Sequence, residues 1–121
     1  MKEKKRIIDQ YLEEELPLEN QNPSIVHRSI RYSVLNGGKR IRPILTMMVA
    51  ELLDQDYNKV LPAAAGIELI HTFSLVHDDL PCMDDDDYRR GKLTNHKVFG
   101  EAMALLTGAA LSVMGLDLIC R

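Results

Sequence analysis

Cysteine, tryptophan and excess charge of either sign are scarce in this sequence. Its 121 residues include two cysteines and no tryptophan, aromatic residues make up 5%, and the formal net charge is −3. Two cysteines as far apart as Cys82 and Cys120 cannot frame a disulfide scaffold, so we expect inert, reduced thiols and a cytoplasmic protein. The lack of a basic excess argues against a nucleic-acid partner.

Long apolar runs are also few, which bears on secretion and on membranes. Residues 1–16 are rich in charge and lack the apolar segment of a signal peptide. The longest run without a charged residue, 102–116, has fifteen residues, whereas a membrane span needs about 20. We therefore expect no membrane span and interpret this run as a buried helix.

Glycine and proline are sparse between the apolar stretches, which favours helices over strands. The length fits one domain, residues 1–121, and no internal repeat or linker divides it. Ser24 after Pro23 is an expected N-cap, Gly37 and Gly38 would end that helix, and Pro43 suits the first turn of the next. The sequence predicts an all-α fold with helices over about 2–16, 24–36, 42–54, 62–80 and 94–119.

Six aspartates lie within ten residues at the end of the fourth expected helix: Asp78, Asp79 and Asp84 to Asp87. A helix turns 100° per residue, so His71 and Asp78 share a face, whereas Asp79 points elsewhere. Pro81 must end or kink the helix, because it lacks a backbone donor and its ring clashes with the preceding turn. Beyond that break the chain can bring Asp84 back toward Asp78. On a straight helix Asp85 would align better, so the spacing leaves these two open.

Carboxylates at a helix C-terminus lie at its negative end, so they favour a bound cation. Hard oxygen ligands select Mg²⁺, Ca²⁺ or Mn²⁺ over Zn²⁺, and the spacing lacks the glycine and glutamate of an EF-hand loop. Mg²⁺ is typically held by one or two carboxylates together with substrate phosphates. The basic residues that follow, Arg89, Arg90 and Lys92, are suited to those phosphates.

A second basic cluster follows two glycines in the stretch NGGKRIRP and comprises Lys39, Arg40 and Arg42. Arginine forks match phosphate oxygens, and paired glycines let the backbone approach a ligand closely. The sequence therefore predicts one metal-bridged phosphate site and one purely basic phosphate site. Two phosphorylated substrates follow from this pair of sites.

These two motifs resemble those of the trans-isoprenyl diphosphate synthases, or polyprenyl synthetases, and within them the bacterial farnesyl diphosphate synthases. The likeness rests on GGKRIRP and on ELIHTFSLVHDDLPCMDDDDYRRGKLTNHKVFGEA, which contains the family's first aspartate-rich motif in its longer form, DDxxxxD. It extends from about residue 25 to the end. The resemblance implies the N-terminal helices of the isoprenoid synthase bundle, incomplete at residue 121, in a protein that forms a homodimer when full-length.

The resemblance also implies roles for individual residues. Asp78 and Asp84 would ligate Mg²⁺, Asp79 would support them as a further catalytic carboxylate, and Arg89 would hold an allylic diphosphate. Isopentenyl diphosphate would be bound by Lys39, Arg42, His71 and Arg90. Phe73, five residues before Asp78, would floor the pocket of the growing chain and set a fifteen-carbon, farnesyl product.

The implied reaction condenses an allylic diphosphate, dimethylallyl or geranyl, with isopentenyl diphosphate. Mg²⁺ and arginines would draw charge onto the leaving diphosphate, and the double bond of isopentenyl diphosphate would attack the allylic cation. Loss of a proton would then give a chain five carbons longer. An apolar cavity would keep water from the cation.

The sequence departs from the family pattern in two places. A second aspartate-rich motif, with a further Mg²⁺, belongs to the C-terminal half of the family, so we expect residues 1–121 alone to be inactive. Gly108-Ala109 stands where the family usually has Gly-Asp, which leaves packing or polarity there in question. Gly100, Gly108 and Gly115 predict close helix packing. A non-catalytic family member or subunit and a terpene cyclase are the alternatives, although a cyclase has no use for GGKRIRP.

Overall fold

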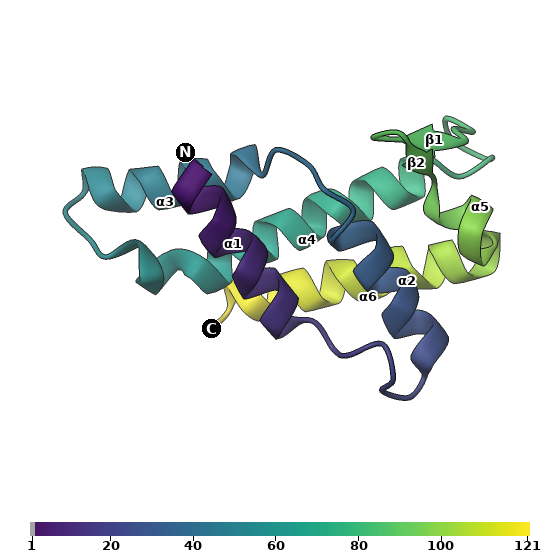
Figure 1. Cartoon of the computed structure of the whole chain (residues 1–121), viewed down its shortest axis with the longest axis horizontal. Helices are drawn as coiled ribbons and strands as arrows, with labels where there is room; N and C mark the ends of the chain where they lie inside the picture. The colour runs from purple at the N-terminus through teal and green to yellow at the C-terminus, as the bar shows by residue number, and fades with distance from the viewer. Residues whose placement is uncertain (1) are drawn as a thin grey trace.

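A computed structural model describes residues 2–121 and contains six α-helices, one 3-10 helix and one short hairpin (Figure 1). The α-helices are α1 (Lys2–Glu15), α2 (Ser24–Val34), α3 (Ile41–Leu52), α4 (Leu61–Asp78), α5 (Asn95–Phe99) and α6 (Glu101–Ile119). The 3-10 helix η1 spans Tyr57–Val60, and strand β1 (Tyr88–Arg89) pairs antiparallel with β2 (Lys92–Leu93). The predicted all-α fold is confirmed.

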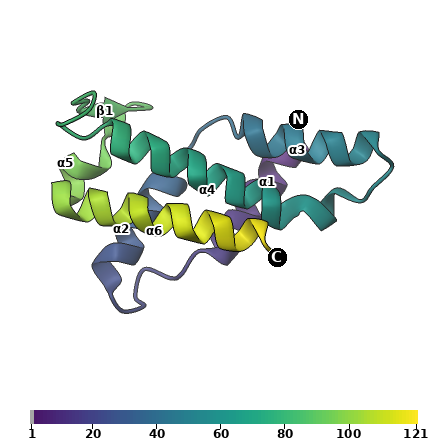
Figure 2. The same cartoon turned by 180° about the vertical axis from the view of Figure 1, so that it is seen from behind.

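The helices α4 and α6 lie side by side and antiparallel, and they form the main contact of the molecule (Figures 1 and 2). Helices α1 and α2 cross one face of this pair, and α3 lies beside the start of α4. Seen from behind, α4 and α6 stand in front, so α1 and α2 cover only one of the two faces. The hairpin and α5 lie at the end of the molecule where α4 ends, which places the aspartate-rich stretch there.

The contact between α4 and α6 is close because glycines face the opposite helix. A Cβ atom on Gly66 would lie 2.5 Å from the backbone oxygen of Gly115, and one on Gly115 would lie 2.7 Å from that of Gly66. A Cβ on Gly108 would fall 2.1 Å from Nε2 of His77. The predicted close packing is therefore found at Gly108 and Gly115, within one chain. Gly100 instead has a φ of 93° and precedes α6.

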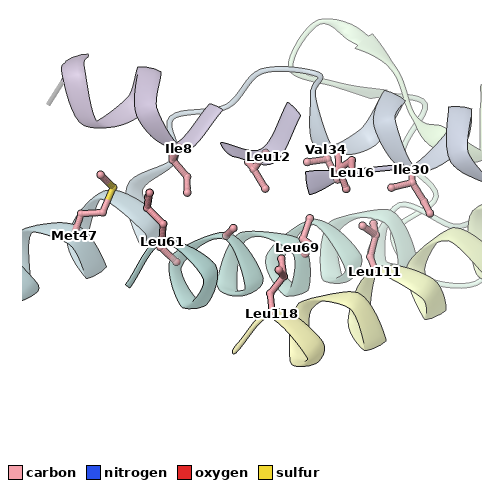
Figure 3. Packing of buried hydrophobic residues seen from close by; sticks show 12 residues of the cluster. Ile8, Leu12, Leu16, Ile30, Val34, Met47, Leu61, Leu69, Leu111 and Leu118 are labelled. Carbon is pink, nitrogen blue, oxygen red and sulfur yellow. The ribbon is translucent and has the colours of Figure 1, made fainter. Parts of the chain in front are cut away.

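The core fills the space between the α4–α6 pair and the helices that cross it. Figure 3 shows apolar side chains of α1 and α2 pointing toward those of α4 and α6. Full burial of one such side chain contributes roughly 1.5–3 kcal/mol, so tertiary packing stabilises these helices more than propensity does. The main cluster includes Ile8, Leu12, Leu16, Ile30, Val34, Met47, Leu61, Leu69, Leu111 and Leu118.

Other large apolar side chains of α3, α6 and their ends remain exposed. They include Leu45, Val49, Leu52, Leu53, Leu105, Leu106, Val113 and Leu116. By length and composition alone, Tyr57–Asp78 and Glu101–Ile119 could each cross a membrane, a test that core helices also pass. The fifteen-residue run without charge therefore understated the apolar length of α6, because charged residues at the ends of a helix do not shorten it. That the chain lacks a membrane span stays a prediction.

Several expected boundaries were wrong, each for a local reason. Pro23 rather than Ser24 is the N-cap of α2, and Ser24 is the first helical residue, with no side-chain cap bond. The expected last helix is two helices, because Gly100 takes a left-handed φ between α5 and α6. Part of the segment between the third and fourth expected helices, residues 55–61, forms η1, where the Asp56 side chain accepts from the backbone N–H of Asn58. The hairpin at 88–93 was not foreseen.

Candidate active site

The aspartate-rich stretch folds back on the end of α4. The helix ends at Asp78, two residues before the expected end at about residue 80 and three residues before Pro81. The backbone N–H of Asp84 then donates to the carbonyl of Asp78 at 2.8 Å, and that of Asp86 donates to the carbonyl of Asp79 at 3.1 Å. Asp85 takes a left-handed φ of 53° within this turn. The backbone therefore brings Asp84 beside Asp78, as the proline break predicted.

Asp79 and Arg89 form a two-bond ion pair between the end of α4 and β1. Arg89 donates from Nε to Oδ2 at 2.9 Å and from Nη2 to Oδ1 at 2.7 Å. The Asp79 side chain is only 5% exposed, and its hydrogen bonds raise the pKa of Arg89 above its ordinary value. Both oxygens of Asp79 and two of the donors of Arg89 are thus engaged within the chain. The roles predicted for Asp79 and Arg89 stay predictions. In this structure the two side chains are bonded to each other.

The other aspartates of the stretch carry charge that the chain does not balance. Asp78 is half-buried and Asp84, Asp85 and Asp86 are exposed. Asp87 pairs with Lys97 at 3.1 Å, whereas none of those four has an ion-pair partner among residues 2–121. In the same described range, no three His, Cys, Asp or Glu side chains are gathered closely enough to hold a metal ion. The donors fit Mg²⁺ in chemistry and in charge, and ligation by Asp78 and Asp84 stays a prediction.

The predicted binding residues for isopentenyl diphosphate do meet in one place. Lys39, Arg42, His71 and Arg90 line a single open pocket of about 510 Å³, which Gly37, Gly38, Arg40 and Glu68 also line. Across residues 2–121 no carboxylate lies within ion-pairing distance of Lys39, Arg42 or Arg90. Burial and the charge of Arg40 lower the pKa of Arg90. We call this the basic pocket, and its unbalanced positive charge fits an anion.

Gly38 makes room for an arginine, and the Gly37 carbonyl accepts a hydrogen bond from it. Arg90 donates from Nη1 to the carbonyl of Gly37 at 2.9 Å. A Cβ on Gly38 would lie 2.8 Å from Cζ of Arg90, and Gly38 has a left-handed φ of 114°. The close approach expected at this glycine pair is therefore made by the Arg90 side chain, which joins the hairpin to the segment before α3.

His71 is a neutral acceptor at the wall of the pocket. Nη1 of Arg42 lies 3.3 Å from Nε2 of His71, and because arginine can only donate, this nitrogen accepts. Burial, reinforced by the charge of Arg42, lowers the pKa of His71. The ring is therefore neutral at neutral pH. Its Nε2 atom accepts the hydrogen bond from Arg42 and holds that side chain at the pocket rim.

Arg40 does not join its neighbours in the pocket as a free cation. Its side chain is 2% exposed and donates to Asp9 Oδ1 at 2.8 Å, to Glu68 Oε2 at 2.8 Å and to the Val34 carbonyl at 2.6 Å. The expectation that Arg40 is available to a phosphate is wrong, because two carboxylates and a carbonyl already occupy its guanidinium. The basic cluster is thus divided into ligand-facing and internal residues.

Phe73 lies on α4 below the aspartates, as its spacing required. It is partly buried against the main core and meets the His77 ring edge-on, with ring centroids 4.9 Å apart. His77 in turn reaches the Leu105 carbonyl of α6 at 3.0 Å. The role of Phe73 in chain length stays a prediction.

A buried polar cluster was missed by the sequence reasoning. The Asn95 side chain at the start of α5 donates to the carbonyl of Ser29 at 3.1 Å and to the hydroxyl of Ser33 at 2.8 Å, and Ser29 contacts Thr107 at 2.6 Å. These residues tie α2, α5 and α6 together next to the hairpin. Small polar residues inside apolar helix faces were the available signal, but pairing them needs tertiary structure.

Ala109, the position at which the resembling family usually has a carboxylate, is exposed.

Comparisons with known proteins identify the family of this chain. The pattern of the family described as polyprenyl synthetase matches residues 23–121. A heterodimeric geranylgeranyl pyrophosphate synthase large subunit from Arabidopsis thaliana is 51% identical over 89% of this chain and 29% of its own length. A geranylgeranyl diphosphate synthase from Cyanophora paradoxa is 48% identical over 97% of this chain and 38% of its own length. This chain therefore belongs to the polyprenyl synthetase family of prenyltransferases.

Solved structures confirm the fold. A farnesyl/geranylfarnesyl diphosphate synthase from Zymomonas mobilis superposes with a TM-score of 0.93 at 38% identity, over 99% of this chain and 43% of that one. A geranyltranstransferase from Thermotoga maritima gives a TM-score of 0.89 at 39% identity, over 98% and 44%. This chain spans less than half the length of these relatives.

Proposed function

We propose that the whole protein elongates prenyl chains by joining an allylic diphosphate to isopentenyl diphosphate. One observation carries this proposal: Lys39, Arg42 and Arg90 converge on one pocket without a carboxylate partner among the described residues. Such a pocket fits a diphosphate, whose charge three cations can balance. It lies two turns along α4 from Asp78, so a second diphosphate at the aspartate-rich turn would be close by.

Each residue then has a definite task. In the basic pocket, Lys39, Arg42 and Arg90 bind the diphosphate of isopentenyl diphosphate, and neutral His71 orients Arg42. At the turn, Arg89 binds the allylic diphosphate from β1, and Asp78, Asp84 and Asp79 present carboxylate oxygens. When bound there, Mg²⁺ supplies neutralisation of the charge that gathers on a departing diphosphate. No side-chain nucleophile is required.

The Asp79–Arg89 pair sets a condition on this arrangement. Because both Asp79 oxygens accept from Arg89, an arriving diphosphate competes with Asp79 for the arginine. Release of Arg89 would leave a buried carboxylate without its partner, which favours a cation arriving together with the diphosphate. We therefore expect the metal and the allylic diphosphate to bind cooperatively.

The proposal also covers the length of the prenyl product. Phe73, one and a half turns deeper on α4 than Asp78, supports a short, fifteen-carbon product. The names of the Arabidopsis and Cyanophora relatives refer instead to geranylgeranyl products, and those of the two solved structures to farnesyl or related products. We propose farnesyl diphosphate, with geranylgeranyl diphosphate as the alternative that a product assay on the full-length protein with labelled isopentenyl diphosphate would reveal.

The assembly we propose is a homodimer. The exposed apolar residues of α6, among them Leu105, Leu106 and Val113, offer a surface for a second copy. The Arabidopsis relative is named as the large subunit of a heterodimer, so a different partner is the competing outcome. Sedimentation of the full-length protein, alone and mixed with candidate small subunits, separates the two.

Calorimetry with inorganic pyrophosphate tests the proposed sites directly. Pyrophosphate should bind the full-length protein, and Mg²⁺ should bind more tightly in its presence than in its absence. Arg42→Gln should weaken pyrophosphate binding roughly tenfold or more, since one charge-assisted hydrogen-bonding group is lost. Lys59→Gln is the matched control, because Lys59 is also a surface cation but lies on η1 and does not line the pocket. Equal Mg²⁺ affinity with and without pyrophosphate would count against a shared site.

A further inference from the structure

We propose that Arg40 and Glu68 are positioning residues of the basic pocket: their buried ion pair fixes the backbone from which Lys39 and Arg42 reach the ligand. This inference rests on the proposed function, because it concerns the same pocket. It gives a positioning role to Arg40, which binds no ligand, and to Glu68, whose negative charge alone would repel a diphosphate.

The first reason is the location of Arg40. It stands between Lys39 and Arg42 in sequence, yet its guanidinium turns away from solvent and contacts three helices. Asp9 belongs to α1, the Val34 carbonyl to α2 and Glu68 to α4. A side chain held at three points has little freedom, so the backbone on either side of it is held as well.

The second reason is the backbone of Arg40 itself. Its φ and ψ are 58° and 35°, in the left-handed region that residues other than glycine seldom adopt. Such a conformation persists only where surrounding contacts impose it. The three hydrogen bonds of the guanidinium are those contacts. The left-handed residue is the N-cap of α3 and stands between Lys39 and Arg42, which both line the pocket.

The third reason is charge. The Glu68 side chain is 3% exposed and lines the basic pocket, where a bare carboxylate would repel a diphosphate. Arg40 is bonded to this carboxylate at 2.8 Å and neutralises it. The pocket thus keeps the positive charge of Lys39, Arg42 and Arg90 for the ligand.

Variants that separate charge from geometry test this inference. Arg40→Lys keeps the charge but cannot span Asp9, Glu68 and the Val34 carbonyl at once, so pyrophosphate affinity should fall about tenfold through lost pre-organisation. The double variant Arg40→Gln/Glu68→Gln removes one positive and one negative charge, leaves the net charge unchanged, and should weaken binding similarly.

Amide hydrogen exchange supplies the readout that a general loss of stability would not reproduce. In Arg40→Lys, exchange should quicken at the amides of residues 38–42 while the amides of Leu69 and Leu111, inside α4 and α6, stay protected. Uniform acceleration in every helix would show that Arg40 serves stability only and would overturn the inference. So would wild-type pyrophosphate affinity in Arg40→Lys when Arg42→Gln is weakened. If the unsubstituted full-length protein binds no pyrophosphate at all, the proposed function fails first and this inference falls with it.

Discussion

Gly115→Ala should destabilise the protein although alanine is the better helix former. At an exposed helical site this change would stabilise by about 1 kcal/mol. At Gly115 the new methyl carbon would lie 2.7 Å from the backbone oxygen of Gly66 and 2.6 Å from Cγ1 of Ile70. Carbon–oxygen contacts are normally about 3.3 Å or longer, so α4 and α6 would have to move apart by roughly half an ångström.

The size of the effect follows from these opposing contributions. Overpacking typically costs about 1–3 kcal/mol, and the upper value applies here because a backbone oxygen cannot rotate away. Subtracting the gain in helix propensity leaves a net loss of about 2 kcal/mol, or about 8 °C in Tm for a domain of this size. A measured loss of stability would show that overpacking outweighs helix propensity, and a gain would show the reverse.

Urea unfolding followed by circular dichroism measures this change in stability. Ala109→Gly is the matched control, because Ala109 is exposed on the same helix and should report propensity alone, a loss of about 1 kcal/mol. In a double-mutant cycle, Ile70→Ala should relieve only part of the clash, since the contact with the Gly66 oxygen remains. A Gly115→Ala protein as stable as the parent would show that the two helices do not touch at this glycine.

Three further outcomes are expected. Phe73→Ala in the full-length protein should lengthen the prenyl products, judged by chromatography of labelled material, whereas Phe99→Ala, which pairs with Tyr32 instead, should not; products of unchanged length would make Phe73 an ordinary core residue. Burial and the charge of Arg42 lower the pKa of His71 in the folded protein. The unfolded chain therefore takes up a proton near pH 6.5 more readily than the folded protein, and stability should fall as the pH drops through this value. The fall should be smaller in His71→Gln, and an identical fall would exclude His71 as its source. Residues 1–121 alone should show no chain elongation with Mg²⁺ and both diphosphates, and should bind an apolar dye through the exposed leucines of α3 and α6; measurable turnover, or a monodisperse monomer without dye binding, would contradict this.

Local chemistry made much of the fold predictable. Apolar spacing located the long helices, and Pro81 required α4 to end close to the aspartates, which it does at Asp78. Motif spacing also placed His71 two turns below Asp78, and the structure puts His71 in the basic pocket with Lys39, Arg42 and Arg90. These features depend on backbone rules that act over a few residues, or on a motif long enough to be specific.

Other features depend on partners far away in the sequence. Nothing near Arg40 in the sequence shows that it pairs with Asp9 and Glu68, and nothing near Arg89 shows that it pairs with Asp79. The same holds for Asn95, whose partners Ser29 and Ser33 lie more than sixty residues away. A single-residue break at Gly100 was missed because glycine is tolerated inside helices as well as at their ends.

The helical class, the family and the set of charged residues that build the site could be predicted without a structure, because periodicity and a long motif are local properties of the chain. Which of those charges are free depends on tertiary packing. A charge is free when no opposite charge is packed against it, and packing joins residues without regard to their separation in sequence. Arg40 and Arg42 are two positions apart, yet one is enclosed by three helices and the other faces the pocket.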